Sequence, residues 1–166
     1  MELRHLVFSA LLAGTALQVQ ALGRLADVQI IDRETGAHLP VYAHGGQYWV
    51  AGTPDARYAI AVHSHSGVRV LAVTSVDGDN VLSGETASWD QTGYVFSPRA
   101  RYQITGWRKS NSEVAAFAFS TASQSYAGRT GRPENVGVIG VALFREKAPE
   151  PMPYVVPERQ MRRDAP

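Results

Sequence analysis

The chain has 166 residues, 45% of them hydrophobic, which fits one globular domain. Its 16 basic and 15 acidic residues give a formal net charge of +1, and the basic residues are scattered along the sequence. Nucleic-acid binders concentrate basic residues on one face, so no nucleic-acid partner is expected. Because there is no cysteine, the chain has neither disulfides nor a lipid-bearing cysteine, and a buried core must stabilise it.

The N-terminus has the three-part pattern of a secretory signal peptide. Residues 1–5 include the basic Arg4, residues 6–19 are apolar and uncharged, and Val19-Gln20-Ala21 resembles a signal-peptidase site. The apolar run of about 14 residues is shorter than the roughly 20 that span a bilayer as a helix, and no other long apolar run follows. We predict a signal peptide over 1–21, cleaved after Ala21, and a periplasmic or secreted mature protein. An uncleaved helix is the alternative.

The first half of the mature chain alternates between apolar and polar residues, as half-buried strands do. We predict strands at 26–32, 38–43, 47–50 and 58–66. Pro40 cannot donate a backbone hydrogen bond, so the second of these strands is expected at a sheet edge. Ser66-Gly67 predicts a hairpin turn into a strand over 68–76, which is apolar on both faces and therefore central.

Turn signals and short apolar runs continue through the second half. Asp77-Gly78 predicts a tight hairpin, because both central residues of such a turn adopt positive φ. We predict further strands at 81–82, 94–96, 101–108, 114–120 and 136–146, with a polar loop over 121–135. The last strand is β-branched on both parities, which indicates burial on both faces. Prolines interrupt the pattern from Ala148 onward, so a disordered tail over 148–166 is predicted.

About nine short strands with almost no helical pattern indicate an all-β domain over residues 22–147. We predict an antiparallel β-sandwich, because several strands are half-buried or apolar on both faces, as two packed sheets require. The strand order does not follow from the pattern.

Several segments match a known group of sequences in order. They are SVDG at 75–78, SGETASWDQTGYV at 83–95, GWRKS at 106–110, EVAAFAF at 113–119, SYAGRTG at 125–131 and NVGVIGVALF at 135–144. Over roughly 57–146 the chain thereby resembles an uncharacterised family of exported bacterial proteins. The resemblance implies a shared domain. Because that family has no established activity, it implies no catalytic residue.

The histidines form an incomplete metal-site pattern. His63 and His65 lie two apart on a predicted strand, so they project from one face and could chelate a metal together with His38 or His44. No spacing pattern supplies the remaining ligands. We therefore interpret the pair as solvent-facing histidines and expect no metal or other cofactor.

The acidic residues fit structural roles better than catalytic ones. Asp77 and Asp79 flank a turn glycine, and without a calcium-loop pattern we assign them to the turn. Glu85, Asp90 and Glu113 could form a carboxylate pair of the glycosidase type, but solvated loop charge is the simpler interpretation. The sequence also has no G-x-S-x-G elbow and no phosphate-binding glycine loop. We therefore do not expect an enzyme.

Aromatic and arginine side chains in turn-rich segments are better candidates for a binding site. Trp and Tyr offer large contact areas to sugars or partner side chains, and Arg pairs with carboxylate or phosphate groups. The candidate ligand-binding residues are Trp89, Asp90, Tyr94, Arg108 and Arg129. Lesser candidates are Trp49, Trp107, Lys109, Tyr126 and Arg132. The alternative is that these aromatics close the ends of the sandwich.

We therefore predict an exported, non-enzymatic β-sandwich module that binds or scaffolds a ligand in the cell envelope or outside the cell. One alternative is a hydrolase acting on a cell-envelope polymer. Another is a subunit of a surface assembly, joined through exposed strand edges such as 39–43.

Overall fold

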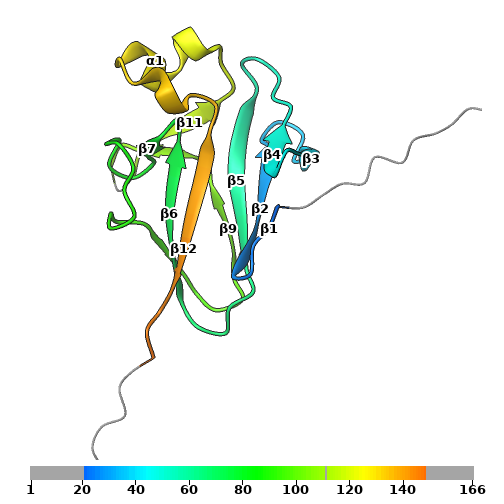
Figure 1. Cartoon of the computed structure of the whole chain (residues 1–166), viewed down its shortest axis with the longest axis vertical. Helices are drawn as coiled ribbons and strands as arrows, with labels where there is room; N and C mark the ends of the chain where they lie inside the picture. The colour runs from blue at the N-terminus through cyan, green and yellow to red at the C-terminus, as the bar shows by residue number, and fades with distance from the viewer. Residues whose placement is uncertain (1–20, 111, 149–166) are drawn as a thin grey trace, which may run out of the picture.

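Two antiparallel sheets pack face to face in this structure, a computed structural model that describes residues 21–110 and 112–148. The larger sheet contains β1 (Ala21–Leu22), β2 (Ala26–Asp32), β5 (Arg57–Ser64), β9 (Arg101–Ile104), β10 (Gly106–Arg108) and β11 (Val114–Ala118). The smaller sheet contains β6 (Val70–Val76), β7 (Asp79–Asn80), β8 (Tyr94–Phe96) and β12 (Ile139–Arg145). The long strands run along the long axis of the molecule (Figure 1).

The strands β5 and β6 are the centres of the two sheets. β5 pairs with β2 on one edge and with β9 and β11 on the other. β6 pairs with β12 along its length, and with β7 and β8 on its second edge. Alternate residues of each strand meet in one core. Its members include Tyr58, Ile60, Val62, Ala72, Val76, Phe96, Ile104 and Phe117.

The predicted antiparallel β-sandwich is confirmed. β2, β4 (Gln47–Val50) and β8 have the predicted bounds, and Asp77-Gly78 forms the tight β6–β7 turn with φ angles of 55° and 82°. The described residues contain more strands than the nine expected, because short pairings such as β1 and β7 leave no periodic pattern. The predicted strand over 101–108 also divides at Thr105: β9 pairs with β5, whereas β10 pairs with β11.

The predicted hairpin at Ser66-Gly67 is wrong. β5 and β6 lie in different sheets, and the residues between them cross from one sheet to the other. The backbone groups of this crossing bond to other segments: the His65 amide donates to Leu25, and the Arg99 amide donates to Ser66. β12 also differs from expectation, because it begins at Ile139 and its residues are half-buried or exposed rather than enclosed on both faces.

The polar segment 121–135 folds into a small cap at one end of the sandwich (Figure 1). It contains η1 (Ala122–Gln124), the single-turn α1 (Tyr126–Arg129) and η2 (Pro133–Asn135). The Ser125 hydroxyl accepts a hydrogen bond from the Gly128 amide at 3.0 Å, as an N-capping residue does. The segment predicted as a loop therefore forms short helical turns held by hydrogen bonds. These turns are too short to give a helical pattern in the sequence.

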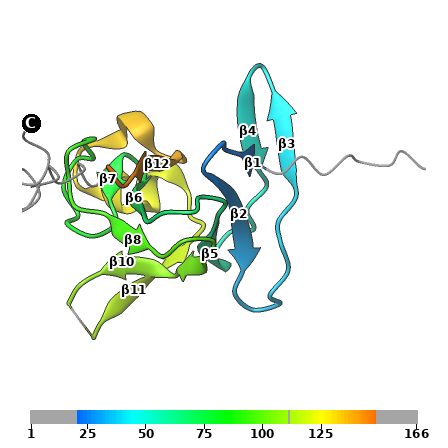
Figure 2. The same cartoon turned by 90° about the horizontal axis from the view of Figure 1, so that it is seen from below.

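A two-stranded hairpin, β3 (Val41–His44) with β4, stands beside the main body (Figure 2). Its strand β3 is shorter than the predicted 38–43, because the Leu39 amide donates instead to Ile30 of β2. Tyr42 and Trp49 face each other across the hairpin, and both are more than half exposed.

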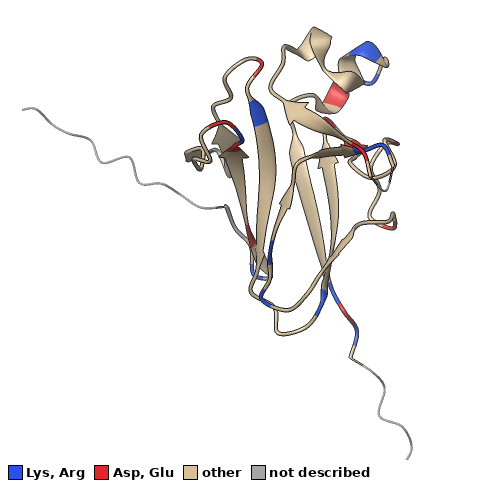
Figure 3. Cartoon of the chain, turned by 180° about the vertical axis from the view of Figure 1, so that it is seen from behind, with Lys and Arg blue, Asp and Glu red and all other residues tan. Residues whose placement is uncertain are grey.

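The predicted signal peptide, apart from Ala21, and the predicted disordered tail, apart from Ala148, lie outside the described residues. No helix within the described ranges has the length and apolar character needed to cross a membrane. Basic and acidic residues are mixed along the strand ends and turns, whereas the long strands are mostly uncharged (Figure 3).

A buried ion pair ties the cap to the smaller sheet. The Asp79 side chain of β7 is only 2% exposed, and its Oδ1 lies 2.6 Å from Nη1 of Arg132. Its Oδ2 is buried and has no hydrogen-bond partner among the described residues. Burial raises the pKa of Asp79, and the nearby Arg132 charge opposes that rise. Asp79 therefore has a second structural role besides its place beside the turn. Arg132 stabilises the fold by pairing with Asp79, so it is not free to bind a ligand.

We expect Arg132→Ala to lower the free energy of unfolding by about 3 kcal/mol, because it leaves a carboxylate buried without its counter-charge. Arg129→Ala, in the same cap but without a carboxylate partner in the described chain, should change it by less than about 0.5 kcal/mol. Asp79→Asn added to Arg132→Ala should restore part of the loss. Urea denaturation measures all three, and equal losses for Arg132→Ala and Arg129→Ala would contradict the assignment.

Candidate functional site

A groove of about 710 Å³ lies where the cap meets β10 and β11. Its lining includes Trp107 and Arg108 from β10, Phe119 from the end of β11, and Tyr126 and Arg129 from α1. We refer to it as the arginine groove. Its lining comes from several segments that are distant in sequence, because the β10–β11 hairpin brings its two strands together and the cap folds back over them.

The floor of the arginine groove is a continuous series of aromatic rings. The Tyr58 ring stacks on Phe117 and Phe119, with centroids 5.2 and 4.5 Å apart. Trp107 meets Phe117 edge-on at 5.7 Å and lies 5.7 Å from Tyr126. Burial raises the pKa of the Tyr58 hydroxyl, which therefore stays neutral. The series runs from the core to Tyr126, which is 43% exposed, so core packing holds the ring platform in place.

Positive charge predominates in the lining of this groove. Its basic side chains are Arg108, Lys109 and Arg129, and its one acidic side chain is Asp77. Lys109 pairs with Glu113 at 3.9 Å, and Asp77 accepts a hydrogen bond from the Gly137 amide at 2.8 Å. The guanidinium groups of Arg108 and Arg129 have no carboxylate partner in the part of the chain that the structure describes. The two arginines are therefore available to an anionic ligand.

The structure divides the predicted binding residues into two groups. Arg108 and Arg129 line one groove, and Tyr94 lies under Arg108, with the guanidinium carbon 5.8 Å from the ring centroid. Trp89 lies elsewhere, over a smaller hollow of about 250 Å³ against β6 and β12. Trp89 is 77% exposed. Asp90 accepts a hydrogen bond from the Ser88 hydroxyl, which lowers the pKa of Asp90.

The loop that carries Trp89 is fixed from within by Asn80. The amide nitrogen of Asn80 donates to the Gln91 side chain and to the Thr92 carbonyl, both at 3.1 Å, and its oxygen accepts from the Leu82 amide at 2.8 Å. Asn80 is 1% exposed. Trp89 thus projects from an organised loop, which no local pattern in the sequence indicated.

The three carboxylates considered for hydrolysis are not gathered in the arginine groove. Glu85, Asp90 and Glu113 are all exposed, and none lines that groove. Glu113 pairs with Lys109 in the β10–β11 turn, and Asp90 is bonded to its own loop. Their surroundings correspond to solvated loop charge.

A second groove, of about 720 Å³, lies on the face of the larger sheet that points away from the core. His38, His63 and His65 line it, and we refer to it as the histidine groove. His44, at the tip of β3, is not part of its lining. An acidic residue that sequence reasoning missed, Asp27 of β2, lies beside His63 and His65. Finding it required the strand order, which periodicity does not give.

Comparison with known proteins assigns no relative: no family model, no curated protein and no solved structure matches the chain. The resemblance of residues 57–146 to an uncharacterised bacterial family therefore stays a prediction.

We expect Asn80→Ala to lower the free energy of unfolding by about 2 kcal/mol, because it removes several buried hydrogen bonds at once. It should also make residues 83–93 the first site of limited proteolysis. Asn135→Ala, at an exposed position, is the control and should leave both measurements near those of the wild type. An unchanged cleavage pattern in Asn80→Ala would show that the loop does not depend on Asn80.

Proposed function

We propose that the protein is an exported, non-enzymatic β-sandwich module that binds an acidic ligand of the cell envelope or the extracellular space in the arginine groove. The carrying observation is that Arg108 and Arg129, without carboxylate partners in the described chain, line one groove beside a platform of aromatic rings. Arginine recognises carboxylate and phosphate groups through two parallel hydrogen bonds. Tyr126 and Trp107 add a rigid apolar surface on which a sugar ring can lie.

The ligand class follows from this combination. A purely cationic groove would favour a small anion, and a purely aromatic platform would favour a neutral sugar. The arginine groove has both features, which fits a saccharide or peptide that carries acid groups. Charge assistance strengthens such hydrogen bonds where the groove limits access of water.

The two alternatives rest on other parts of the molecule. A hydrolase acting on an envelope polymer needs a positioned acid and base, and the candidate carboxylates lie outside the arginine groove. A surface-assembly subunit would use the outer edge of β3, which has no partner strand among the described residues. The exposed Tyr42 and Trp49 of that hairpin favour assembly as the second candidate.

We expect the mature protein to bind tri-galacturonic acid, an acidic trisaccharide, more tightly than maltotriose, an uncharged one. Arg108→Gln and Arg129→Gln should each weaken binding of the acid about tenfold, the equivalent of one charge-assisted hydrogen bond, and leave maltotriose unaffected. Tyr126→Leu should weaken both. Amide chemical shifts in NMR titrations give the affinities and locate the contacts.

Arg145→Gln is the matched control, because Arg145 is an exposed arginine of β12 that lines neither large groove. It should leave both affinities unchanged. Equal binding of the acid by the wild type and by the Arg108→Gln, Arg129→Gln double variant would overturn the proposal. If Arg145→Gln weakened binding equally, the interaction would be a general attraction between charges rather than binding in the arginine groove.

Export is tested separately from binding. We expect the full chain, expressed in a bacterium, to be recovered outside the cytoplasm with an intact mass that begins at Leu22. Ala21→Arg should block processing, because signal peptidase requires a small residue there. Cleavage after Ala21 removes the Ala21–Val28 pair of β1 and β2 and retains Leu22, which lies opposite Asp27. Uncleaved wild-type chain in the cytoplasm would contradict the proposal.

A further inference from the structure

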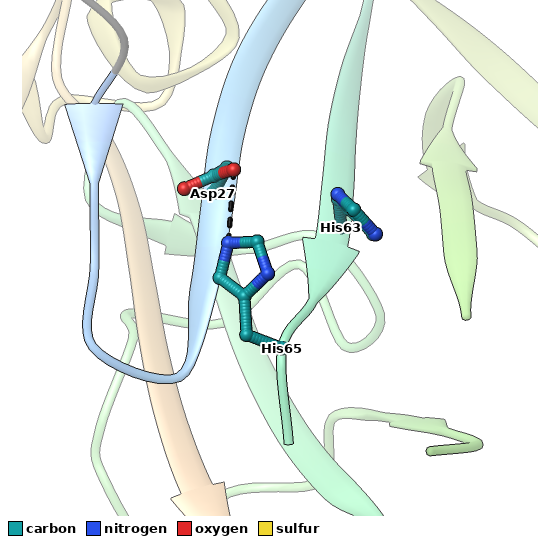
Figure 4. A group of neighbouring side chains, drawn as sticks. All are labelled: Asp27, His63 and His65. Carbon is teal, nitrogen blue, oxygen red and sulfur yellow. Dashed lines mark ion pairs between the residues drawn. The ribbon is translucent and has the colours of Figure 1, made fainter. Parts of the chain in front are cut away.

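The side chains of Asp27, His63 and His65 lie close together in the histidine groove. Asp27 of β2 lies directly opposite His63 of β5 in the antiparallel register, so the two side chains project from the same face. His65 follows two residues later, and its amide continues the pairing by donating to Leu25. Figure 4 shows the three side chains side by side. One potential ligand atom from each lies within 4.8 Å of the others.

The Asp27 carboxylate is only half satisfied by its neighbours. Its Oδ2 lies 2.9 Å from Nε2 of His65, and the side chain is 14% exposed. Its Oδ1 is buried and has no hydrogen-bond partner among the described residues. A buried carboxylate oxygen without a partner is unfavourable. A cation bound by this carboxylate would offset part of that cost.

The donor set selects a class of metal. Two imidazoles and one carboxylate suit zinc and the neighbouring divalent transition metals, whereas calcium and magnesium prefer sites made of oxygen atoms. Tetrahedral zinc places its ligand atoms about 3.4 Å apart. The most separated pair of ligand atoms here, up to 4.8 Å apart, therefore has to close by up to about 1.4 Å. The His65 side chain is 42% exposed, so the surrounding protein leaves space for such an adjustment.

We propose that Asp27, His63 and His65 form a binding site for a divalent transition-metal ion of the zinc class. Three protein ligands leave one tetrahedral position open toward the groove. Arg101 of β9 pairs with His63 on the other edge of β5 and lines the same groove. Its positive charge disfavours a second cation and favours an anion or water at the open position. The site shares no lining residue with the arginine groove and does not depend on the proposed function.

Calorimetric titration with zinc chloride tests the site directly. The protein is the mature chain without a polyhistidine tag, treated first with a chelator. We expect one zinc ion per chain, with binding that weakens in acid because protons compete for the imidazole nitrogens. Calcium and magnesium should not bind. Cobalt(II) should occupy the same site and give the visible absorption of tetrahedral coordination.

The variants separate this site from incidental histidine binding. His63→Ala, His65→Ala and Asp27→Asn should each weaken zinc binding at least about a hundredfold, beyond the usual effect of losing a supporting residue. The mature chain has two further histidines, and His44 lies outside the lining of the histidine groove, so His44→Ala is the matched control that should bind as the wild type does. Because His65 is exposed, its variant should keep the wild-type circular dichroism.

Three results would overturn the proposal. They are the absence of stoichiometric zinc binding at 100-micromolar zinc, undiminished binding by His65→Ala, and a loss of binding in His44→Ala equal to that in His63→Ala. The first would leave Asp27 and His65 as a simple ion pair of the sheet.

Discussion

The antiparallel pairing of β2 with β5 is the constraint on which the core and the histidine cluster both depend. The register runs from Ala26 opposite Ser64 to Asp32 opposite Tyr58. Because side chains alternate between the two faces, a slip of one residue would turn the apolar set of β2 toward solvent and Asp27 toward the core. The apolar core fixes this register. By fixing it, the core also places Asp27 beside His63.

The two grooves lie toward opposite ends of β5. Tyr58, near its beginning, lines the arginine groove, and His63, near its end, lines the histidine groove on the opposite face. A single strand with neighbours on both edges therefore supports both surfaces. Each groove is completed by a different distant segment: the cap after β11 closes one, and the segment joining β2 to β3 borders the other.

Sequence reasoning succeeded where the cause of a structure is local. Alternation located β2, and the positive φ that Asp77-Gly78 tolerates located a hairpin. It failed at Ser66-Gly67, because β5 and β6 each find longer partner strands elsewhere, and a turn pattern carries no information about those partners. The candidate sites show the same contrast between local patterns and long-range pairing. Arg108 and Arg129 were found by residue type and turn-rich surroundings, whereas Asp27 was missed because only long-range pairing brings it to His63 and His65.

The three tryptophans of the chain are spread one to a region. Trp49 lies on the side hairpin, Trp89 on the loop fixed by Asn80, and Trp107 in the floor of the arginine groove. Two of them are largely exposed and the third packs against Phe117. The molecule therefore contains three natural fluorophores in different environments. With two of them replaced by phenylalanine, the remaining indole emission reports on one region alone, without an attached dye.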